Sequence, residues 1–319
     1  MDVDSQSNLF PPASEPPSES AHLSTDASLQ AALGAFEQYM EAEGFALNTR
    51  KAFASDIRLL GQYLGIGQSI GQIGTKNLND FLVWLRHERG VPCSQKSYAR
   101  RVTTLKKFFS WLHKAGVLPD DPSAAVIQIS VSSPLPELPT ESELQQALAV
   151  TSAIREGSAE AKPDARPHLL LTLLLDTGIK KSEAIALVPN HIDRQDPERP
   201  FLFIRIKNPR LRWKERKIPL QPAWLDVLDE YLAQYEPTDT LFTCTARNLE
   251  YILSDVGEAA GLPQGRLSFE NLRWCSALKE YRQEDEPGAI RQRLGLSPIT
   301  WRETKKKLDR LMTRQANAH

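Results

Sequence analysis

A group of prolines divides the chain into two blocks of helical sequence. Five prolines fall between residues 117 and 139, where each lacks a backbone donor and stops a helix from continuing. On both sides, apolar residues recur every three or four positions, as in amphipathic helices. A chain of 319 residues is long enough for two domains. We therefore predict a helical domain at residues 29–116, a linker at 117–139 and a second domain at 140–319.

The first block predicts several amphipathic helices around one core. The last of them has an apolar face through Val102, Leu105 and Phe109, and Gly116 behind it suits a left-handed helix end. Residues 1–28 are rich in proline, serine and acidic residues and contain few large apolar ones. They cannot bury enough surface to offset the entropy of ordering, so we expect them to be disordered.

The second block is also mainly helical, with one short β region. Thr140 and Glu143 form a capping box that opens its first helix. Residues 201–206 and 215–220 predict two strands around a basic turn. The chain is therefore expected to be mostly α, with a small antiparallel β-sheet in its second domain.

The net charge of −1 conceals three basic segments. Residues 96–107 hold five basic residues and no acid, residues 201–220 hold seven with one acid, and residues 302–314 hold six with two acids. Such clusters on a neutral background indicate a polyanionic partner. Three solvated faces explain the charges equally well when charge alone is considered.

Several classes of protein are excluded by composition and spacing. Cys93, Cys244 and Cys275 lie far apart, so they predict neither a metal site nor a disulfide framework, and a reducing cytoplasm is expected. No apolar run approaches the roughly 18 residues of a membrane span, and the N-terminus lacks the pattern of a signal peptide. We expect no metal, no cofactor and no membrane partner.

Short motifs along the chain point to a known family. They are SYARR at 97–101, LKKFF at 105–109, LLLDTGIKKSE at 173–183, KERKIPL at 214–220, Leu272-Arg273 and Leu294-Gly295. In this order and at these separations they resemble the tyrosine recombinases, or phage integrases, of the Xer type. The resemblance implies a four-helix, SAM-like core-binding domain followed by a mainly α catalytic-type domain with a small antiparallel sheet. It also implies a role in DNA recombination or integration.

The resemblance also implies a chemistry, in which a tyrosine hydroxyl attacks the scissile phosphate. Two arginines hold the phosphate oxygens, a lysine in the strand turn protonates the leaving oxygen, and two further positions assist. Here Lys180 stands in place of the first arginine, Glu270 in place of a histidine and Leu296 in place of another. Arg273 is retained, and Lys305 occupies the position of the tyrosine.

The turn lysine is ambiguous, because this turn is longer than the family pattern. Lys207 is the first candidate, with Arg210 and Arg212 behind it. No tyrosine follows Tyr281, which is too early in the chain to be the nucleophile. A carboxylate at Glu270 about 4 Å from a phosphate would cost about 4 kcal/mol at an effective dielectric near 20.

We therefore predict a DNA-binding protein of this fold that is non-catalytic or accessory. An active site-specific recombinase with unusual chemistry, in which the Lys305 amine attacks phosphorus, is the alternative. A protein-interaction scaffold without DNA binding is a third possibility, which the basic segments argue against. Duplex DNA is the expected partner, with an active recombinase or a second copy of the chain beside it.

The basic segments and the motif positions supply the predicted DNA contacts. These are Lys96, Arg100, Arg101, Lys107, Lys207, Arg210, Arg212 and Arg273. Arg273 has a structural alternative, an ion pair with Glu270 three residues earlier on the same helix. Trp213 lies in the basic turn, where it belongs either to the core or against a sugar or base.

Overall fold

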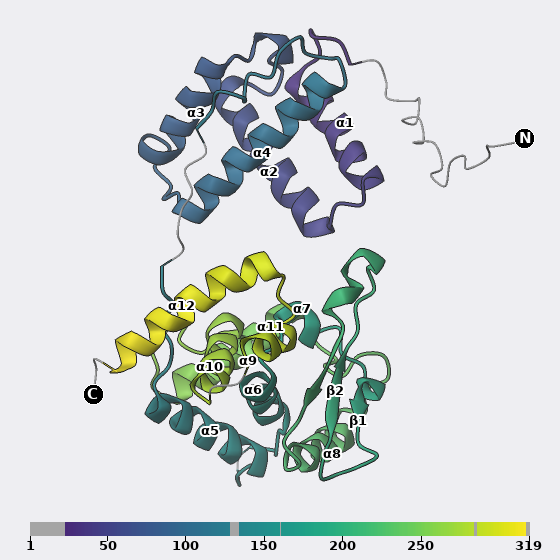
Figure 1. Cartoon of the computed structure of the whole chain (residues 1–319), viewed down its shortest axis with the longest axis vertical. Coiled ribbons are helices and arrows are strands. Elements are labelled where there is room, and N and C mark those ends of the chain that lie inside the picture. Colours follow the sequence, from purple (N-terminus) through teal and green to yellow (C-terminus); the bar gives the residue numbers. More distant parts are fainter. Residues whose placement is uncertain (1–22, 128–133, 160, 284–285, 317–319) are drawn as a thin grey trace, which may run out of the picture. The chain divides into compact units, whose positions relative to one another are not determined.

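The computed structural model describes residues 23–127, 134–159, 161–283 and 286–316, with side chains up to residue 314. The chain divides into two compact units, Met1–Ser133 and Pro134–His319, drawn in purple to blue and in teal to yellow (Figure 1). The boundary between them lies inside the proline-containing segment 117–139. No described helix is long and apolar enough to cross a bilayer.

The first unit is a four-helix assembly around one core. Its helices are α1 (Leu29–Ala42), α2 (Leu47–Leu64), α3 (Thr75–His87) and α4 (Gln95–Lys114), with a 3-10 turn at Ile70–Gln72 (Figure 1). Ser94 caps α4 by accepting from the Ser97 amide at 3.1 Å, and Gly116 behind the helix has φ +72°. Phe36, Phe81 and Phe108 fill the core with almost no exposed surface.

The described parts of the expected tail and of the expected linker pack against the apolar cores of the two units. Residues 1–22 of the expected disordered tail lie outside the described residues, but residues 23–28 contact the first core through Leu23 and Ala27. The expected linker packs at both ends: Leu118 and Val126 are buried in the first unit, and Leu135 and Leu138 pack in the second. Prolines end helices, but they do not prevent neighbouring apolar side chains from being buried.

The second unit is mainly helical with a three-stranded sheet, which confirms the predicted fold class. Its helices are α5 (Glu141–Glu156), α6 (Arg166–Thr177), α7 (Lys181–Ala184), α8 (Trp224–Tyr235), α9 (Ala246–Ala259), α10 (Phe269–Arg282), α11 (Pro287–Arg293) and α12 (Pro298–Ala316). The antiparallel strands are β1 (Ile192–Asp193), β2 (Phe201–Ile204) and β3 (Arg216–Pro219), in that order, with Leu202 opposite Ile218. The two-residue β1 lacks a sequence signal because it is too short for any periodicity.

Two apolar clusters hold the second unit together and position its site. The larger surrounds α6, which packs against α5, α8, α9 and α10 and is apolar almost all round. In the smaller, Trp301, Leu308 and Leu311 of α12 pack with Leu278 of α10 and Ile290 of α11. The helix α12, drawn in yellow in Figure 1, therefore packs against α10 and α11 of the same unit. The C-terminal ends of α6 and α11 point to a common place near α10.

Candidate nucleic-acid interface

Arg273 of α10 ties together the C-terminal ends of two helices. Its guanidinium donates to the carbonyl of Gly178, where α6 ends, and to the carbonyl of Leu294, where α11 ends. Gly178 and Gly295 both have φ +57°, the left-handed conformation in which helices commonly stop. Burial lowers the pKa of Arg273 to about 10, although Glu183 opposes that shift. Helix C-termini carry partial negative charge, so carbonyl dipoles hold this arginine.

The alternative ion pair between Arg273 and Glu270 does not form. Glu270 is exposed in the first turn of α10, while the Arg273 side chain points to the helix ends described above. An acidic residue in the first turn of a helix is favourable to the helix dipole. Arg273 is therefore one predicted site residue that the structure places at the centre of a buried group.

Arg216 of β3 forms a buried, two-pronged ion pair with Glu183 of α7. The two Nη atoms donate to the two carboxylate oxygens at 2.9 and 2.8 Å, and each side chain is 7% exposed. Nε of Arg216 donates to the carbonyl of Arg293. A Cβ on Gly295 would lie 2.9 Å from Nη1, so only glycine leaves room for the guanidinium. Although burial opposes ionisation of Glu183, Arg216 holds its pKa below the usual value.

Lys180 joins this group from the residue just before α7. Its pKa is lowered first by burial and then by the positive charges of Arg273, Lys214 and Arg216, with Glu183 as the opposing charge. Glu183 already accepts from Arg216 and from the backbone amide of Lys180 at 2.8 Å. We call Lys180, Lys214, Arg216 and Arg273 the basic cluster. These four cations carry more positive charge than the one carboxylate among them, Glu183, can neutralise. Such an arrangement attracts an anion that can accept several hydrogen bonds.

The connection between β2 and β3 brings a different lysine to this group than the sequence favours. It contains a 3-10 helix, Pro209–Lys214 (η3), which returns Lys214 to Lys180. Lys207, Arg210 and Arg212 are exposed, and none of them acts on the pKa of Lys180. Lys214 is therefore the basic residue of this connection that acts on Lys180, while the other three lie on the surface.

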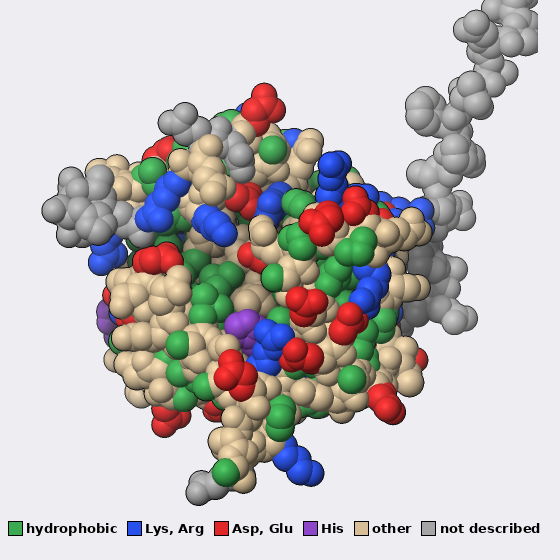
Figure 2. Space-filling model, turned by 90° about the horizontal axis from the view of Figure 1, so that it is seen from below, with side chains coloured by type: hydrophobic (Ala, Val, Ile, Leu, Met, Phe, Trp, Pro, Cys, Tyr) green, Lys and Arg blue, Asp and Glu red, His purple; other side chains and the backbone are tan. Residues whose placement is uncertain are grey.

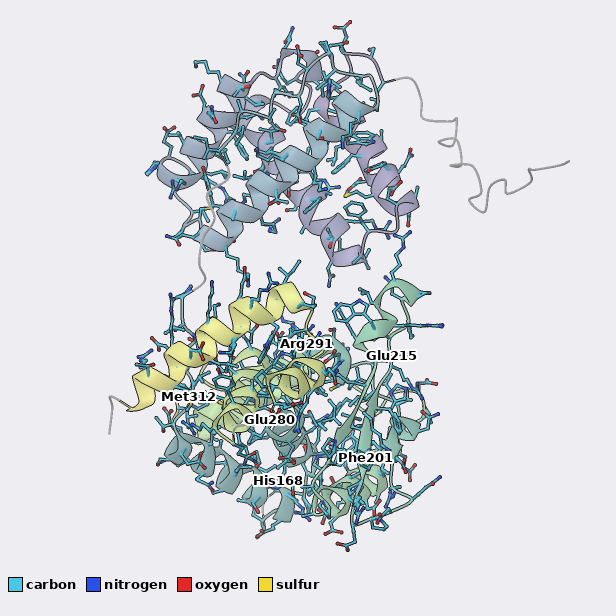
Figure 3. The ribbon with its side chains drawn as sticks, viewed as in Figure 1. His168, Phe201, Glu215, Glu280, Arg291 and Met312 are labelled. Carbon is cyan, nitrogen blue, oxygen red and sulfur yellow. The ribbon has the colours of Figure 1, made fainter. Side chains whose placement is uncertain are left out.

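Trp213 and Leu296 line a neighbouring cavity. A cavity of about 750 Å³ lies between β3 and α11, and its lining includes Trp213, Leu296 and the labelled Glu215 and Arg291 (Figure 3). Trp213 is 53% exposed, which rules out the core interpretation of this residue. Leu296 is half-buried against the cluster of α10, α11 and α12. It offers an apolar surface where the resemblance expects a donor.

Lys305 belongs to a separate set of contacts between α10 and α12. Its Nζ lies 3.5 Å from Asp309 Oδ2 and 5.8 Å from the ring centre of Tyr281. The Tyr281 hydroxyl donates to Asp309 Oδ1 at 2.5 Å. A hydrogen bond with Tyr281 and the nearby negative charge of Asp309 raise the pKa of Lys305. The structure gathers Lys180, Arg273 and Lys214, while it ties Lys305 to the surface of α12.

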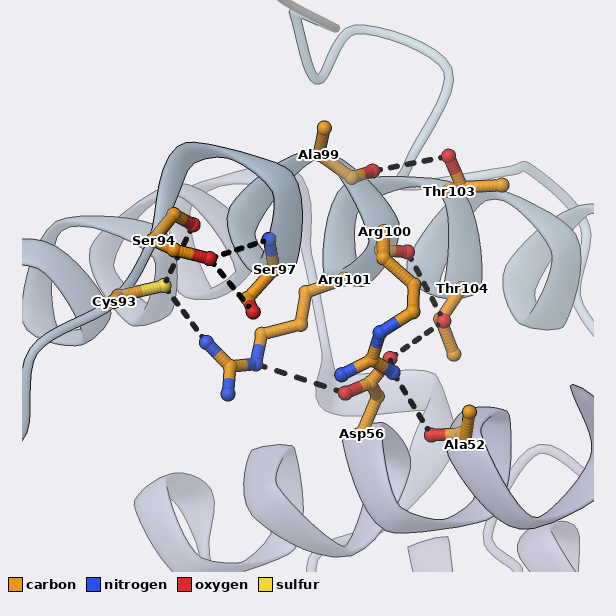
Figure 4. A network of polar contacts seen from close by, with 10 residues as sticks. All are labelled: Ala52, Asp56, Cys93, Ser94, Ser97, Ala99, Arg100, Arg101, Thr103 and Thr104. Atoms are coloured by element: carbon orange, nitrogen blue, oxygen red, sulfur yellow. Dashed lines mark hydrogen bonds and ion pairs between the residues drawn. The ribbon is translucent and has the colours of Figure 1, made fainter. Parts of the chain in front are cut away.

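In the first unit, two of the predicted DNA contacts are engaged inside the protein. Asp56 of α2 is 3% exposed and accepts from Arg100 and from Thr104, the latter at 2.8 Å, while Arg101 Nε lies 3.6 Å from its other oxygen (Figure 4). Arg101 also donates to Cys93 Sγ at 2.7 Å. Arg100 and Arg101, which the sequence predicts as DNA contacts, therefore also join α4 to α2.

Other basic residues of α4 remain on the surface. Lys96 and Lys107 are exposed, as the sequence predicts for contacts with an anion. Figure 2 shows another face of the molecule, on which acidic and basic side chains are interspersed among hydrophobic ones. Within the described residues, no three His, Cys, Asp or Glu side chains lie close enough to hold a metal ion.

Comparison with known proteins relates both units to one family. Residues 33–116 match the family model of the phage integrase N-terminal SAM-like domain. The chain is 32% identical over 207 residues to the tyrosine recombinase XerD of Agrobacterium fabrum, which covers 64% of this chain and 59% of the relative. It is 31% identical over 168 residues to the tyrosine recombinase XerC of Mycobacterium bovis, which covers 52% of this chain and 54% of the relative. This chain is a homologue of the Xer tyrosine recombinases. The matches span little more than half of these curated relatives.

Solved structures of tyrosine recombinases share the fold of this Xer homologue. The site-specific recombinase XerH, bound to its difH substrate before cleavage, has a TM-score of 0.62 at 21% identity, with 87% of this chain and 80% of that chain covered. A λ integrase dimer bound to a COC′ core site has a TM-score of 0.65 at 18% identity, with 87% and 77% covered. The similarity extends over both units.

Proposed function

We propose that this Xer homologue binds duplex DNA and does not cut it through a tyrosine nucleophile. The basic cluster is the observation that carries the proposal. Its four cations have one carboxylate among them, Glu183, which already accepts hydrogen bonds from Arg216 and from the Lys180 amide. A DNA phosphate would supply the missing negative charge and accept charge-assisted hydrogen bonds. Such an anion would offset the repulsion from Arg273, Lys214 and Arg216, which adds to the effect of burial in lowering the pKa of Lys180.

The surroundings of Lys305 support the absence of cleavage. A lysine attacks as a free amine, which requires a lowered pKa and a desolvated site. Lys305 has a raised pKa and lies on the surface, so it remains a protonated ammonium without a free electron pair. No tyrosine follows Tyr281 to replace it, and Leu296 has no group that could donate to a phosphate.

The similar structures support duplex DNA as the partner. XerH is bound to a recombination substrate, and λ integrase is seen as a dimer on a core site and as a tetramer on a Holliday junction. We propose that this chain likewise acts on DNA beside other subunits, either an active recombinase or further copies of itself. This role implies the cytoplasm, where DNA is accessible and the three free cysteines stay reduced.

DNA binding through the basic cluster can be measured by fluorescence anisotropy. We expect the unaltered protein to bind a mixed-sequence duplex at 50 mM salt, with log affinity falling against log salt by about 0.9 per phosphate contacted. Lys180→Gln with Lys214→Gln should make that slope shallower by about one, because one phosphate contact is lost. Lys162→Gln with Arg199→Gln, which removes the same charge from exposed positions, should leave the slope unchanged. No binding at 50 mM salt would refute the proposal.

Cleavage can be tested with a nicked suicide duplex that carries a site selected with this protein. We expect no covalent band on a denaturing gel, either from the unaltered protein or from Lys305→Tyr. Restoring one position should do little, since the altered positions all act on one transition state. Activity should begin to return only when Lys180→Arg, Glu270→His, Leu296→His and Lys305→Tyr are combined. A covalent band from the unaltered protein that disappears in Lys305→Ala would establish the alternative, an active enzyme with a lysine nucleophile.

A further inference from the structure

One face of α12 carries basic side chains at a regular interval of four residues. We call Arg302, Lys306, Arg310 and Arg314 the α12 stripe; all four are exposed. Residues four apart lie about 6 Å apart along a helix axis and on the same side of it. The stripe is therefore a row of positive charge on α12, the helix drawn in yellow in Figure 1.

The other basic residues of α12 have partners inside the unit. Lys305 interacts with Asp309 and Tyr281, and Lys307 Nζ lies 5.8 Å from the ring centre of Trp274. By contrast, no ion pair or side-chain hydrogen bond joins a member of the α12 stripe to another described residue. The helix thus separates two cations that hold it to α10 from four that face solvent.

This row of like charges is unfavourable for the isolated helix. Like charges four residues apart repel one another, and the stripe contains three such pairs in succession. The helix is held in place despite this repulsion by Trp301, Leu308 and Leu311 on its opposite, buried face. A regular polyanion would remove the repulsion, and duplex DNA presents one negative charge for about every 1.7 Å of its axis.

We propose that the α12 stripe lies along the phosphate backbone of duplex DNA. This inference rests on the proposed function and adds to it a second DNA contact, made by a different element than those that carry the basic cluster. Because α12 packs on α10 and α11 of its own chain, the stripe and the basic cluster belong to the same subunit. In this homologue the helix that bears Lys305 therefore contributes backbone contacts, which position the protein without reading sequence.

The stripe can be tested by removing its two central charges in the full chain. Lys306→Gln with Arg310→Gln should make the salt slope shallower by about two and weaken binding at 150 mM salt roughly thirtyfold, if the part of the affinity that does not depend on salt is unchanged. The melting temperature should stay the same or rise, because repulsion within the helix is reduced. Lys306→Arg with Arg310→Lys keeps both charges and should keep the slope.

The matched control separates this inference from the proposed function. Lys162→Gln with Arg199→Gln changes the net charge equally and should bind as the unaltered protein does. If Lys306→Gln with Arg310→Gln binds with the same slope and affinity as this control, the stripe is not a DNA contact, while the proposed function stands. If the unaltered protein does not bind duplex DNA at all, both fail together.

Discussion

Arg216→Met should lower the free energy of unfolding of the second unit by about 3–5 kcal/mol, because it leaves Glu183 buried without its partner. Both side chains are 7% exposed, so solvent cannot replace the lost guanidinium. For a unit of this size the change corresponds to a melting temperature lower by roughly 6–20 °C. Urea unfolding followed by circular dichroism measures the effect.

Two further variants test whether the ion pair is responsible. Lys217→Met alters the adjacent strand residue, whose side chain is 46% exposed, and should change stability little. Glu183→Leu combined with Arg216→Met removes both buried charges and should recover much of the loss. If Arg216→Met and the unaltered protein unfold at the same urea concentration, the ion pair does not stabilise the unit.

The same pair predicts a dependence of stability on pH. The folded-state pKa of Glu183 lies below the usual value of 4.5. Its contribution is therefore fully present above that value and is lost as the pH falls through the lower folded-state pKa. Arg216→Met should flatten this part of the acid-unfolding curve.

Asp56→Ala should destabilise the first unit by about 3–5 kcal/mol. The carboxylate is 3% exposed and binds Arg100, Arg101 and the fully buried Thr104, so its removal takes away the one charged partner that α2 offers to these residues of α4. Hydrogen exchange read out separately for α2 and α4 in the full chain measures the loss, and protection of the second unit should be unchanged.

An exposed aspartate in the same unit provides the comparison. Asp80 pairs with Lys76 four residues earlier on α3, at 2.9 Å and in contact with solvent, so Asp80→Ala should leave exchange in α2 and α4 as it is. Equal protection in Asp56→Ala and Asp80→Ala would mean that the network around Asp56 does not hold the two helices together.

The elements of this protein follow from residues close together in the sequence. The capping box that opens α5 forms as predicted: the Thr140 amide donates to Glu143 at 2.7 Å, and the Glu143 amide donates to Thr140 at 3.2 Å. Helical periodicity likewise predicts the buried face of α4 through Val102, Leu105 and Phe109. These features depend on residues three or four positions apart, so local sequence is sufficient to specify them.

The candidate site depends on pairs that no local rule connects. Glu183 and Arg216 are 33 residues apart, and no spacing signal singles out Arg216 within KERKIPL. Which basic residue of the connection comes near Lys180 depends on how η3 winds back toward α7, which residue types alone do not specify.

Tertiary packing also gives two of the basic residues of α4 an acidic partner that the sequence pattern does not indicate. Arg100 appears in the sequence as one cation among several, but it lies against a carboxylate 44 residues earlier. A charge pattern identifies which residues are basic, whereas burial decides which of them are neutralised inside the protein. The sequence alone therefore determined the helices, their caps and the family resemblance. The fold decided which cations pair inside the protein and which remain exposed, because that choice is made by long-range contacts.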